Sequence, residues 1–438
     1  MRRPKIHLPL PGPNAQRAIA RSDEFISTSY TRDYPLVAER GEGCWIYDPD
    51  GNEFLDMTAG IAVCTTGHCH PQVVAAIREQ AGKLVHMSGT DFFYSVQSRL
   101  AQRLGELGAV RGDHHRVYFC NSGTEANEAV IKLARYKTRR QGIVAFLGGF
   151  HGRTLGTLSA TASKVVHRRG FSPLLPGVFH APFPDPMRHG ADASARALEH
   201  LDAMFARLIA PDEVAAILVE PIQGEGGYVV PPDDFLHELR RRCDTHGILL
   251  AYDEVQSGLG RTGKMFAWQH VGAEPDIVAL AKGIASGLPL GAMIARAELM
   301  DWPPGSHAST FGGNPVACAA AHATLDLLLG GLVDHAHHVG EHLRRLLMPC
   351  AREHVRIAEV RGRGLMLALE IVRDRASLAP DPDARQRILQ GCFERGLLLL
   401  GCGPGAVRFC PALVVSEEEA SVAVEIFAEV LRSVLAKA

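Results

Sequence analysis

A set of polar and aromatic residues in the middle of the chain has the types and settings needed to hold one small ligand. The set consists of Ser122-Gly123-Thr124, Phe150-His151-Gly152, Asp253-Glu254-Val255-Gln256, Lys282 and Thr310. A lysine amine can hold an aldehyde, a carboxylate can hold a protonated ring nitrogen, and a helix N-terminus can hold a phosphate. Together these groups predict a flat aromatic cation that carries a phosphate and an aldehyde, which describes pyridoxal 5′-phosphate.

Asp253 and Lys282 each stand at the end of a short apolar run. A carboxylate at the carboxyl edge of a parallel sheet lies where α/β proteins bind ligands, and if buried it needs a cationic partner. A pyridinium N–H at about 3 Å would supply roughly 5 kcal/mol at an effective dielectric near 20. Burial lowers the pKa of a lysine amine and favours a Schiff base. Considered alone, Asp253 could equally be an aspartate in a salt bridge, and Lys282 could be a lysine at the protein surface.

The phosphate site is expected at Ser122-Gly123-Thr124-Glu125, which follows an apolar run and opens a helix. Ser-x-x-Glu is a capping box, so the segment starts a helix whatever else it does. The same geometry points free backbone N–H groups and the positive end of the helix dipole outward, and the hydroxyls of Ser122 and Thr124 can add donors. The pattern predicts an anion site, with a well-capped helix as the alternative.

The faces and edge of a planar ring have candidate partners nearby. Phe150 can stack on the ring, His151 follows it, and Gly152 permits close approach of the backbone. Val255 can press on the ring, while Gln256 can bond a ring hydroxyl. A core aromatic residue and a capping histidine are the structural alternatives for the first two.

A glycine-rich loop and one arginine offer charges for recognising substrates. The loop Glu220-Pro-Ile-Gln-Gly-Glu225-Gly-Gly227 holds two carboxylates, Glu220 and Glu225, which beside a charged cofactor are candidates for gating or for positioning water. Arg408 offers a guanidinium fork for a substrate carboxylate. Solvated turn residues and an arginine at a strand edge are the alternatives.

Length, charge and composition are those of an ordinary globular protein. The 438 residues allow two or three core-bearing units, and the net charge of −2 gives no reason to expect nucleic acid or a membrane surface as partner. No apolar run approaches the ~18 residues of a membrane span. The basic start is followed by prolines and not by the apolar stretch of a signal peptide, so we expect a cytoplasmic protein.

The ten cysteines contain no Cys-x-x-Cys pair and are expected to be reduced thiols, mostly packed inside. One cluster, Cys64, His68, Cys69 and His70, holds four potential metal ligands. Because no second cluster with zinc-like spacing complements it, we expect a loop there and no metal.

The elements that must position these residues change character along the chain. Residues 1–35 are expected to form an arm ordered by other surfaces, and 45–56 a hairpin around an Asp-Gly turn. Between about 98 and 300, apolar runs alternate with amphipathic helices, which predicts an α/β unit whose mostly parallel sheet is covered on both faces. The runs are Arg116–Cys120, Ile143–Leu147, Val214–Val219, Ile248–Tyr252, Asp276–Leu280 and Gly291–Ala295.

A second, α+β unit is predicted after about residue 325. Its expected elements are a long helical stretch, strands at Gly364–Ile371, Leu397–Gly401 and Val407–Phe409, a helix near 383–395 and a terminal helix. Strands and helices are mixed here without regular alternation, which separates this unit from the preceding one.

Taken together, the segments resemble the class III (ornithine/acetylornithine/4-aminobutyrate type) aminotransferases, which are fold-type I pyridoxal-phosphate enzymes. The likeness covers roughly residues 25–435, and the occurrence of its motifs in this order is highly specific. The matching phrases are Gly60–Val63 with Gly67–Pro71, Ser122–Ala129, Phe150–Thr154, Glu220–Gly227, Asp253–Gly263, Leu280–Gly283 and Thr310–Pro315. Leu397–Gly403, before Arg408, looks especially like the 4-aminobutyrate branch.

The resemblance implies a large domain with a mostly parallel seven-stranded sheet and a small α+β domain built from both chain ends. It places an N-terminal arm and part of the small domain at 1–70, the large cofactor-binding domain at 71–325 and the rest of the small domain at 326–438. It also implies a homodimer, or a dimer of such dimers, with both active sites at the subunit interface.

Roles for single residues also follow from the resemblance. Lys282 would carry the Schiff base and move a proton between Cα and C4′, while Asp253 would hold the ring nitrogen. Thr310 would reach the phosphate of the neighbouring subunit's site. Arg408 would bind the acceptor's carboxylate, and Glu225 would pair with Arg408 when the donor has no carboxylate there.

The implied reaction moves an amino group from an amino-acid donor, such as 4-aminobutyrate, ornithine or N-acetylornithine, to a 2-oxo acid, 2-oxoglutarate or pyruvate. The donor stays open, because it depends on pocket residues such as Ile61, Thr90, Phe92 and Phe93.

Two other functions fit the same fold. A racemase or epimerase needs a second acid opposite Lys282. Glu225 and Thr310–Pro315 favour the aminotransferase, because racemases of this fold tend to carry Asp at the first position and to lack the Gly-Gly-Asn-Pro run. A non-catalytic binding protein would not need Lys282, Asp253 and Arg408 all intact.

Overall fold

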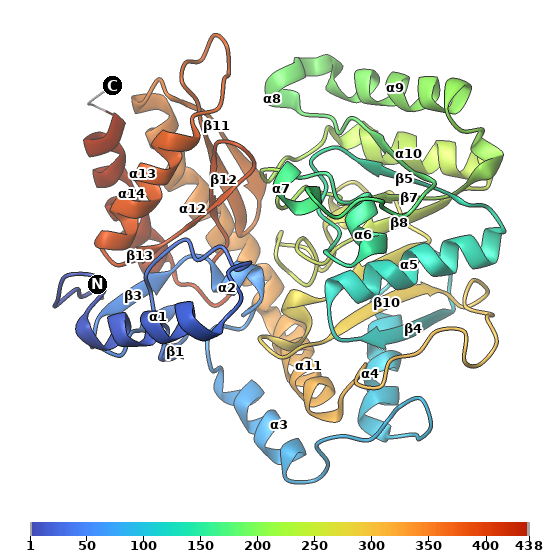
Figure 1. Cartoon of the computed structure of the whole chain (residues 1–438), viewed down its shortest axis with the longest axis horizontal. Helices are drawn as coiled ribbons and strands as arrows, with labels where there is room; N and C mark the ends of the chain where they lie inside the picture. Colours follow the sequence, from blue (N-terminus) through green and yellow to red (C-terminus); the bar gives the residue numbers. More distant parts are fainter. Residues whose placement is uncertain (1, 436–438) are drawn as a thin grey trace.

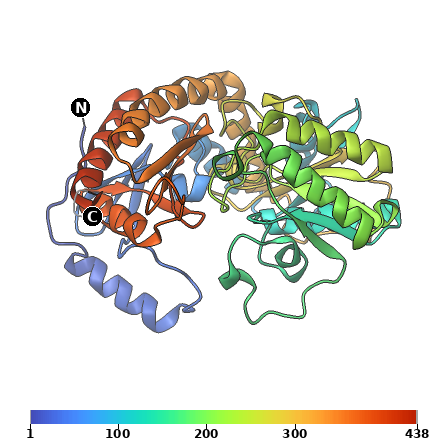
Figure 2. The same cartoon turned by 90° about the horizontal axis from the view of Figure 1, so that it is seen from above.

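The computed structural model describes residues 2–435, which form two adjacent bodies (Figure 1). The larger body is a sheet flanked by helices. The smaller body combines sheets and helices from both ends of the chain, and Figure 2 shows the N-terminal helix on its outer side. The architecture is therefore α/β with a second α+β unit, as predicted.

The large body is built on a seven-stranded sheet. Its strands are β4 (His115–Cys120), β5 (Gly142–Phe146), β6 (Val178–Ala181), β7 (Val214–Val219), β8 (Leu249–Asp253), β9 (Ile277–Leu280) and β10 (Gly291–Arg296). Their order is β4-β10-β9-β8-β7-β5-β6. The strands from β9 to β6 run parallel, and β10 runs antiparallel to β9 and β4, which confirms the predicted mostly parallel sheet. Strand β6 was not predicted, since it is short and contains a histidine.

Alternate residues of the strands pack on opposite faces of this sheet. In β7, Ala216 and Leu218 belong to the core beneath helix α5 (Gly123–Thr138), while Ile217 and Val219 belong to the core beneath α10 (Asp233–His246). Because both faces are covered, β7 and β8 are buried along their whole length and are apolar except at the end.

The carboxyl ends of five strands meet at one edge of the sheet. Strands β5, β7, β8 and β9 are parallel, and β4 has the same direction because the reversed β10 separates it from β9. The segments that follow these five strands carry the predicted site residues of the large body apart from Thr310. This edge is where α/β proteins bind ligands.

Helices of the large body cover the sheet and connect its strands. They are α3 (Pro71–Ala81), α4 (Ser95–Glu106), α6 (Leu155–Ala160), α7 (Val165–Arg168), α8 (Pro186–His189), α9 (Ala193–Arg207) and α11 (Pro315–Leu327), besides α5 and α10. Helix α5 begins after Ser122, whose side chain accepts a hydrogen bond from the Glu125 amide, and ends at the left-handed Arg139. The capping pattern thus correctly predicted this helix.

The small body contains two four-stranded sheets. One is β1 (Arg40–Glu42), β2 (Trp45–Tyr47), β3 (Glu53–Asp56) and β13 (Leu397–Leu398), and the other is β11 (Ile357–Arg363), β12 (Met366–Ile371), β15 (Ala406–Phe409) and β14 (Leu400–Cys402). Its helices are α1 (Pro13–Phe25), α2 (Ala59–Ala62), α12 (Val333–Glu353), α13 (Pro382–Glu394) and α14 (Glu417–Leu435). Parallel pairing of β13 with β3 joins the two ends of the chain, as expected.

Three details of the small body differ from the sequence-based expectations. The single strand expected at 397–401 is two strands, because the chain passes from one sheet to the other after Leu398. Strand β11 was missed, since charged residues interrupt its apolar pattern. The arm at 1–35 contains the helix α1, whose first turn donates backbone N–H groups to Asp50.

A helical stretch at Pro315–Glu353 joins the two bodies through α11, a short π-helical segment and α12. By length and composition it could cross a membrane, although the sequence analysis expected no apolar stretch of that length. Half of its most apolar window is buried. It packs on α3, α14 and β11. Core helices of soluble proteins can have the same length and apolar composition as a membrane span. It is weak evidence for a membrane span.

The domain limits near 70 and 325 stay a prediction. The sheets agree with them, because β1 to β3 pair with β13 and no strand between 71 and 325 joins a sheet of the small body. Met1 and residues 436–438, at the ends of the outer ranges, lie outside the described residues.

Candidate active site

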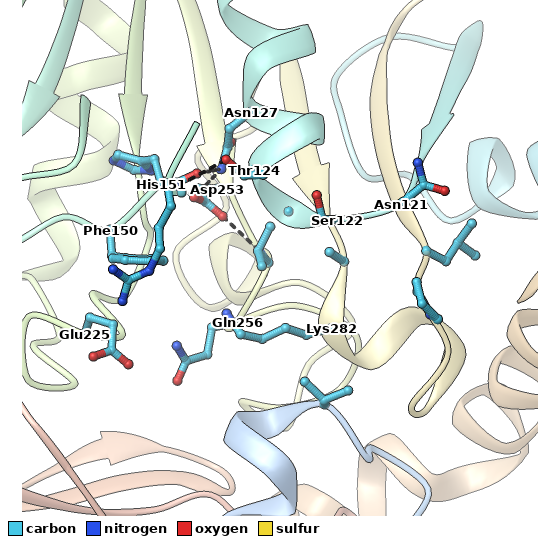
Figure 3. Close-up of a pocket in the computed structure, with 18 of the residues that line it drawn as sticks. Asn121, Ser122, Thr124, Asn127, Phe150, His151, Glu225, Asp253, Gln256 and Lys282 are labelled. Atoms are coloured by element: carbon cyan, nitrogen blue, oxygen red, sulfur yellow. Dashed lines mark hydrogen bonds and ion pairs between the residues drawn. The ribbon is translucent and has the colours of Figure 1, made fainter. Parts of the chain in front are cut away.

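The edge of the seven-stranded sheet opens into a cavity of ≈ 470 Å³ beside the small body. Most of the predicted site residues line it, and Figure 3 shows several of them pointing toward one space. Those that line it are Ser122, Gly123, Thr124, Phe150, His151, Glu220, Glu225, Asp253, Val255, Gln256 and Lys282.

Asp253, the last residue of β8, is held by three donors. Its Oδ2 faces His151 Nδ1 at 2.8 Å and accepts from Asn127 Nδ2 at 2.7 Å, and its Oδ1 accepts from the Val255 amide at 3.0 Å. Asn127 Nδ2 also donates to the His151 carbonyl, so helix α5, strand β8 and the loop after β5 are tied together (Figure 3). Asp253 is therefore fixed at the wall of the cavity.

The charge of His151 depends on this pair. Complete burial favours the neutral ring, but the hydrogen bond to Asp253 and the nearby carboxylates raise the pKa of His151 above its usual value. The carboxyl of Glu220 lies in the same buried region, and burial raises the pKa of Glu220 to about 7 although the charge of His151 opposes it. Glu220 accepts from the amides of Phe150 and Gly224, so it connects the loops after β5 and β7.

Lys282 follows β9 in a short turn, with a left-handed backbone (φ 42°). The next residue must be small, because a Cβ on Gly283 would lie 2.3 Å from the hydroxyl of Thr65. Among residues 2–435, the amine of Lys282 has no hydrogen-bond or ion-pair partner, and it lines the cavity. Burial lowers the pKa of Lys282, while Asp253 and Glu225 oppose this effect. A neutral amine is a nucleophile.

Helix α5 presents its N-terminus to the cavity. The amides of Gly123 and Thr124 have no partner within the described part of the chain, as expected for the first turn of a helix. The Thr124 hydroxyl, expected as a phosphate donor, instead lies 2.6 Å from the Thr157 hydroxyl and accepts from the Arg153 amide. Backbone amides and the Ser122 hydroxyl are therefore the better anion donors.

Two glycines allow close contacts around this helix end. A Cβ at Gly123 would lie 2.8 Å from Val255 Cγ1, and one at Gly152 would lie 2.1 Å from Thr124 Oγ1. Gly152 also has a φ of 141°, which side chains rarely adopt. The sequence predicted a close approach of the Gly152 backbone to a cofactor, whereas the close contact in the structure is to Thr124.

Arg408 and Glu225 form the expected pair. Arg408 Nη1 donates to Glu225 Oε1 at 2.7 Å, and Lys164 Nζ lies 3.5 Å from the other carboxylate oxygen. Burial disfavours the charge of Glu225, but Arg408 and Lys164 hold its pKa below the usual value. Arg408 itself is buried beside the cavity without lining it, and its Nε has no partner among residues 2–435.

Five residues named in the sequence analysis do not line the cavity of this chain. Thr310 and Ile61 do not line it, and neither do Thr90, Phe92 and Phe93. Ile61 has a left-handed backbone and is 43% exposed, and the neighbouring Val63 lines the cavity in its place. Thr310 and its neighbour Phe311 are exposed.

Sequence reasoning missed some residues of the wall. They are Val63, Asn121, Asn127, Arg153, Ala281 and the segment 287–290. The position of two of them could have predicted a place in the wall. Asn127 lies about one helical turn after Thr124 and so on the same helix face, and Arg153 directly follows Gly152. The segment 287–290 is apolar and gives no chemical signal.

The cluster of potential metal ligands is engaged in other contacts. His68 Nε2 lies 2.8 Å from Asp56 Oδ2, and His70 caps helix α3. Burial alone would lower the pKa of His68, but the partners Asp56 and Cys64 raise it to about 10. No group of three or more candidate ligands occurs among residues 2–435.

These groups fit pyridoxal phosphate. An unpaired amine, a buried carboxylate, free amides at a helix end and the apolar side chains Phe150 and Val255 line one cavity. The amine fits the aldehyde of the cofactor, the carboxylate fits the ring nitrogen, the amides fit the phosphate, and the apolar side chains fit the faces of the ring.

Comparison with known proteins identifies the family. Residues 26–431 match the family described as Aminotransferase class-III. The chain is 42% identical to an acetylornithine aminotransferase of Methanopyrus kandleri, over 94% of this chain and 98% of that protein. It is 39% identical to an alanine/serine racemase of Pyrococcus horikoshii, over 99% of this chain and 94% of that protein.

A solved structure agrees with the fold. The amine transaminase of an uncultivated Pseudomonas species, in its PLP-bound form, matches with a TM-score of 0.85 and 32% identity, over 94% of this chain and 98% of that chain. The chain therefore belongs to the class-III aminotransferases. It is an enzyme of fold type I, a pyridoxal-phosphate-dependent aminotransferase.

Proposed function

We propose that the enzyme transfers an amino group from an ω-amino or α-amino acid to 2-oxoglutarate, with the cofactor held by Lys282. The observation that carries this proposal is the unpaired, buried amine of Lys282 in one cavity with Asp253. When bound, the cofactor supplies an electron sink for the charge left on the donor carbon after its proton is removed. Lys282 Nζ, whose pKa is lowered by burial, would take that proton.

The other residues hold the cofactor in place. Asp253, supported by His151 and Asn127, binds the ring nitrogen. The amides at the start of α5 and the Ser122 hydroxyl bind the phosphate. Phe150 and Val255 pack on the ring, and Gln256 donates to the ring oxygen; Glu220 supports the loops that carry Phe150 and Glu225.

Two arginines define the substrate class. Arg408 binds a carboxylate when Glu225 moves away and is neutralised by Glu225 otherwise. Arg153 lines the cavity, and its guanidinium forms no ion pair among residues 2–435. A molecule with two carboxylates, such as 2-oxoglutarate, satisfies both, while 4-aminobutyrate, ornithine or N-acetylornithine needs only one of them.

A second function is favoured by one observation, the alanine/serine racemase among the relatives. Racemisation needs an acid on the face opposite Lys282. Glu225 is poorly suited to that role, because its cationic neighbours lower its pKa and occupy both oxygens. Transamination therefore has the better support.

One experiment separates the two functions. Purified holoenzyme is incubated with single-enantiomer amino acids, with and without 2-oxoglutarate, and the products are resolved by chiral chromatography. We expect glutamate to form only when 2-oxoglutarate is present, together with loss of the cofactor's visible absorbance on adding donor alone. The opposite enantiomer appearing without an acceptor would make the enzyme a racemase.

We further propose a homodimer in the cytoplasm. Exposed apolar side chains occur on the segment 85–93 and next to Thr310: they are Val85, Phe93 and Phe311. The Asn314 side chain donates to the Val85 carbonyl, and the ring of Phe311 lies 5.0 Å from that of His86, so the two segments are adjacent. A second subunit would cover this patch and bring Thr310 to its own phosphate site. The free, mostly buried cysteines fit a reducing compartment.

Light scattering tests the assembly. The expected mass is twice the 47.4 kDa of one chain, or four times for a dimer of dimers. Phe93→Asp should lower the mass to that of a monomer and weaken retention of the cofactor. A monomeric wild-type protein that retains its cofactor would contradict the shared site.

A further inference from the structure

The amide of Gln256 is clamped between two residues of the loop that follows β7. Its Oε1 accepts a hydrogen bond of 2.8 Å from the hydroxyl of Tyr228. On the other side Gly224 is so close that a Cβ there would lie 2.4 Å from Gln256 Nε2. Gln256 is buried and lines the cavity.

The nitrogen of this amide is left without a partner. Within residues 2–435, Gln256 Nε2 donates no hydrogen bond; the bond to Tyr228 involves only Oε1. Because Gln256 lines the cavity, its unpaired Nε2 is available as a donor to an acceptor bound there.

Tyr228 is held firmly in the position from which it donates. It is fully buried, and its backbone has a φ of 57°, a strained conformation for a residue with a side chain. The loop around it is braced by Arg361 Nε, which donates to the Gly227 carbonyl at 2.8 Å, and by the Gly403 amide, which donates to the Glu225 carbonyl at 2.8 Å. Burial raises the pKa of Tyr228 well above its usual value, so the hydroxyl keeps its proton.

We propose that Tyr228 is a positioning residue for the cofactor: its hydroxyl fixes the Gln256 amide so that Nε2 faces the cavity as a donor to the ring oxygen. The inference rests on the proposed function, because it needs the cofactor in this cavity. Without the hydroxyl, the amide can turn over and present Oε1, an acceptor, to the electron-rich ring oxygen. Tyr228 thus acts on the cofactor through Gln256 and without touching it.

The test compares two buried tyrosines, one whose hydroxyl donates to Gln256 and one whose hydroxyl makes no hydrogen bond within residues 2–435. Tyr228→Phe removes the donor to Gln256 and keeps the ring. Tyr252→Phe is the matched control, because Tyr252 is also fully buried but its hydroxyl has no partner within the described residues 2–435. We expect Tyr228→Phe to raise the dissociation constant of pyridoxal phosphate by about fivefold to twentyfold and to shift the absorbance of the bound cofactor. Tyr252→Phe should change neither.

A double-mutant cycle distinguishes positioning from a general structural effect. Gln256→Ala should weaken cofactor binding by at least as much as Tyr228→Phe. In the Gln256→Ala background, Tyr228→Phe should add nothing, because the hydroxyl acts only through the missing amide. Additive losses, or an unchanged dissociation constant in Tyr228→Phe, would overturn the inference.

Borohydride trapping distinguishes a failure of this inference from a failure of the proposed function. Wild type and every variant are reduced with cofactor bound, and the modified peptide is identified by mass. An adduct at Lys282 in the wild type with normal binding by Tyr228→Phe would refute only the role of Tyr228. A wild type without an adduct at Lys282 would overturn the cofactor site and this inference together.

Discussion

Arg408 donates from Nη1 to Glu225 Oε1 over 2.7 Å and so connects strand β15 of the small body to the loop after β7 of the large body. Arg408 is only 4% exposed, and its Nε has no partner in the part of the chain that the structure describes. A buried arginine without a counter-charge is costly, so either Glu225 or a substrate carboxylate must neutralise it. This exchange lets one site take substrates of different charge.

Glu225→Gln should change the preference between substrates. The variant keeps the size of the side chain but loses the charge-assisted bond, so Arg408 becomes permanently available to carboxylates. We expect kcat/KM for L-glutamate, relative to 4-aminobutyrate, to rise by about tenfold, equal to 1.4 kcal/mol. Glu238→Gln, which removes the charge of a surface carboxylate paired with Arg241 and Arg242, serves as control. An unchanged ratio would argue against the exchange.

Lys282→Ala should abolish turnover while some cofactor stays bound without a covalent link. The reason is that both the bond to the aldehyde and the proton transfer depend on this amine. Steady-state assays and the mass of the borohydride-reduced peptide measure the two effects. Turnover at the wild-type rate would refute the assignment.

Asp253→Ala should lower both cofactor retention and rate, by about tenfold or more for each. The variant removes the carboxylate that His151 and Asn127 hold at the cavity wall, and with it the contact that each of them makes to Asp253. Dialysis against cofactor-free buffer measures retention. Normal activity in this variant would contradict a role at the ring nitrogen.

Gly152→Ala should weaken phosphate binding. The added Cβ would lie 2.1 Å from Thr124 Oγ1, so the start of helix α5 must shift. Gly170→Ala is the control, because Gly170 also has a positive φ (85°) but no atom near the added Cβ. We expect the cofactor's dissociation constant to rise by about tenfold or more in the first variant only. Equal effects in both would assign the loss to backbone strain.

Glu254→Gln should alter how stability depends on pH. Burial raises the pKa of Glu254 to about 7, well above the value of a carboxyl in the unfolded chain, so the folded protein binds the proton more tightly. Stability from this group is therefore present at low pH and is lost as pH rises from about 4.5 through about 7, by about 3 kcal/mol. Relative to wild type, the variant should gain thermal stability between pH 5 and pH 8. A constant difference would contradict the raised pKa.

The amino-acid sequence by itself determined which residues could hold the cofactor and that the large body is a mostly parallel sheet with helices. Asp253, Lys282 and Ser122 each follow a run of apolar residues, and a polar residue directly after a buried strand must emerge at the sheet edge. The capping pattern at Ser122 likewise placed a helix start beside them. These signals are local, since they depend on neighbours within about four positions, and so the sequence alone contains them.

Only the tertiary structure decided how distant residues pair. Arg408 and Glu225 are 183 positions apart, and Tyr228 reaches Gln256 across two different loops. Asn127 lies about one helical turn after Thr124, but no local pattern predicts that its side chain donates to Asp253. Contacts of this kind depend on how helices and domains pack, and no local periodicity records that packing. For the same reason Ile61, predicted from its motif, lies outside the cavity while Val63 lines it.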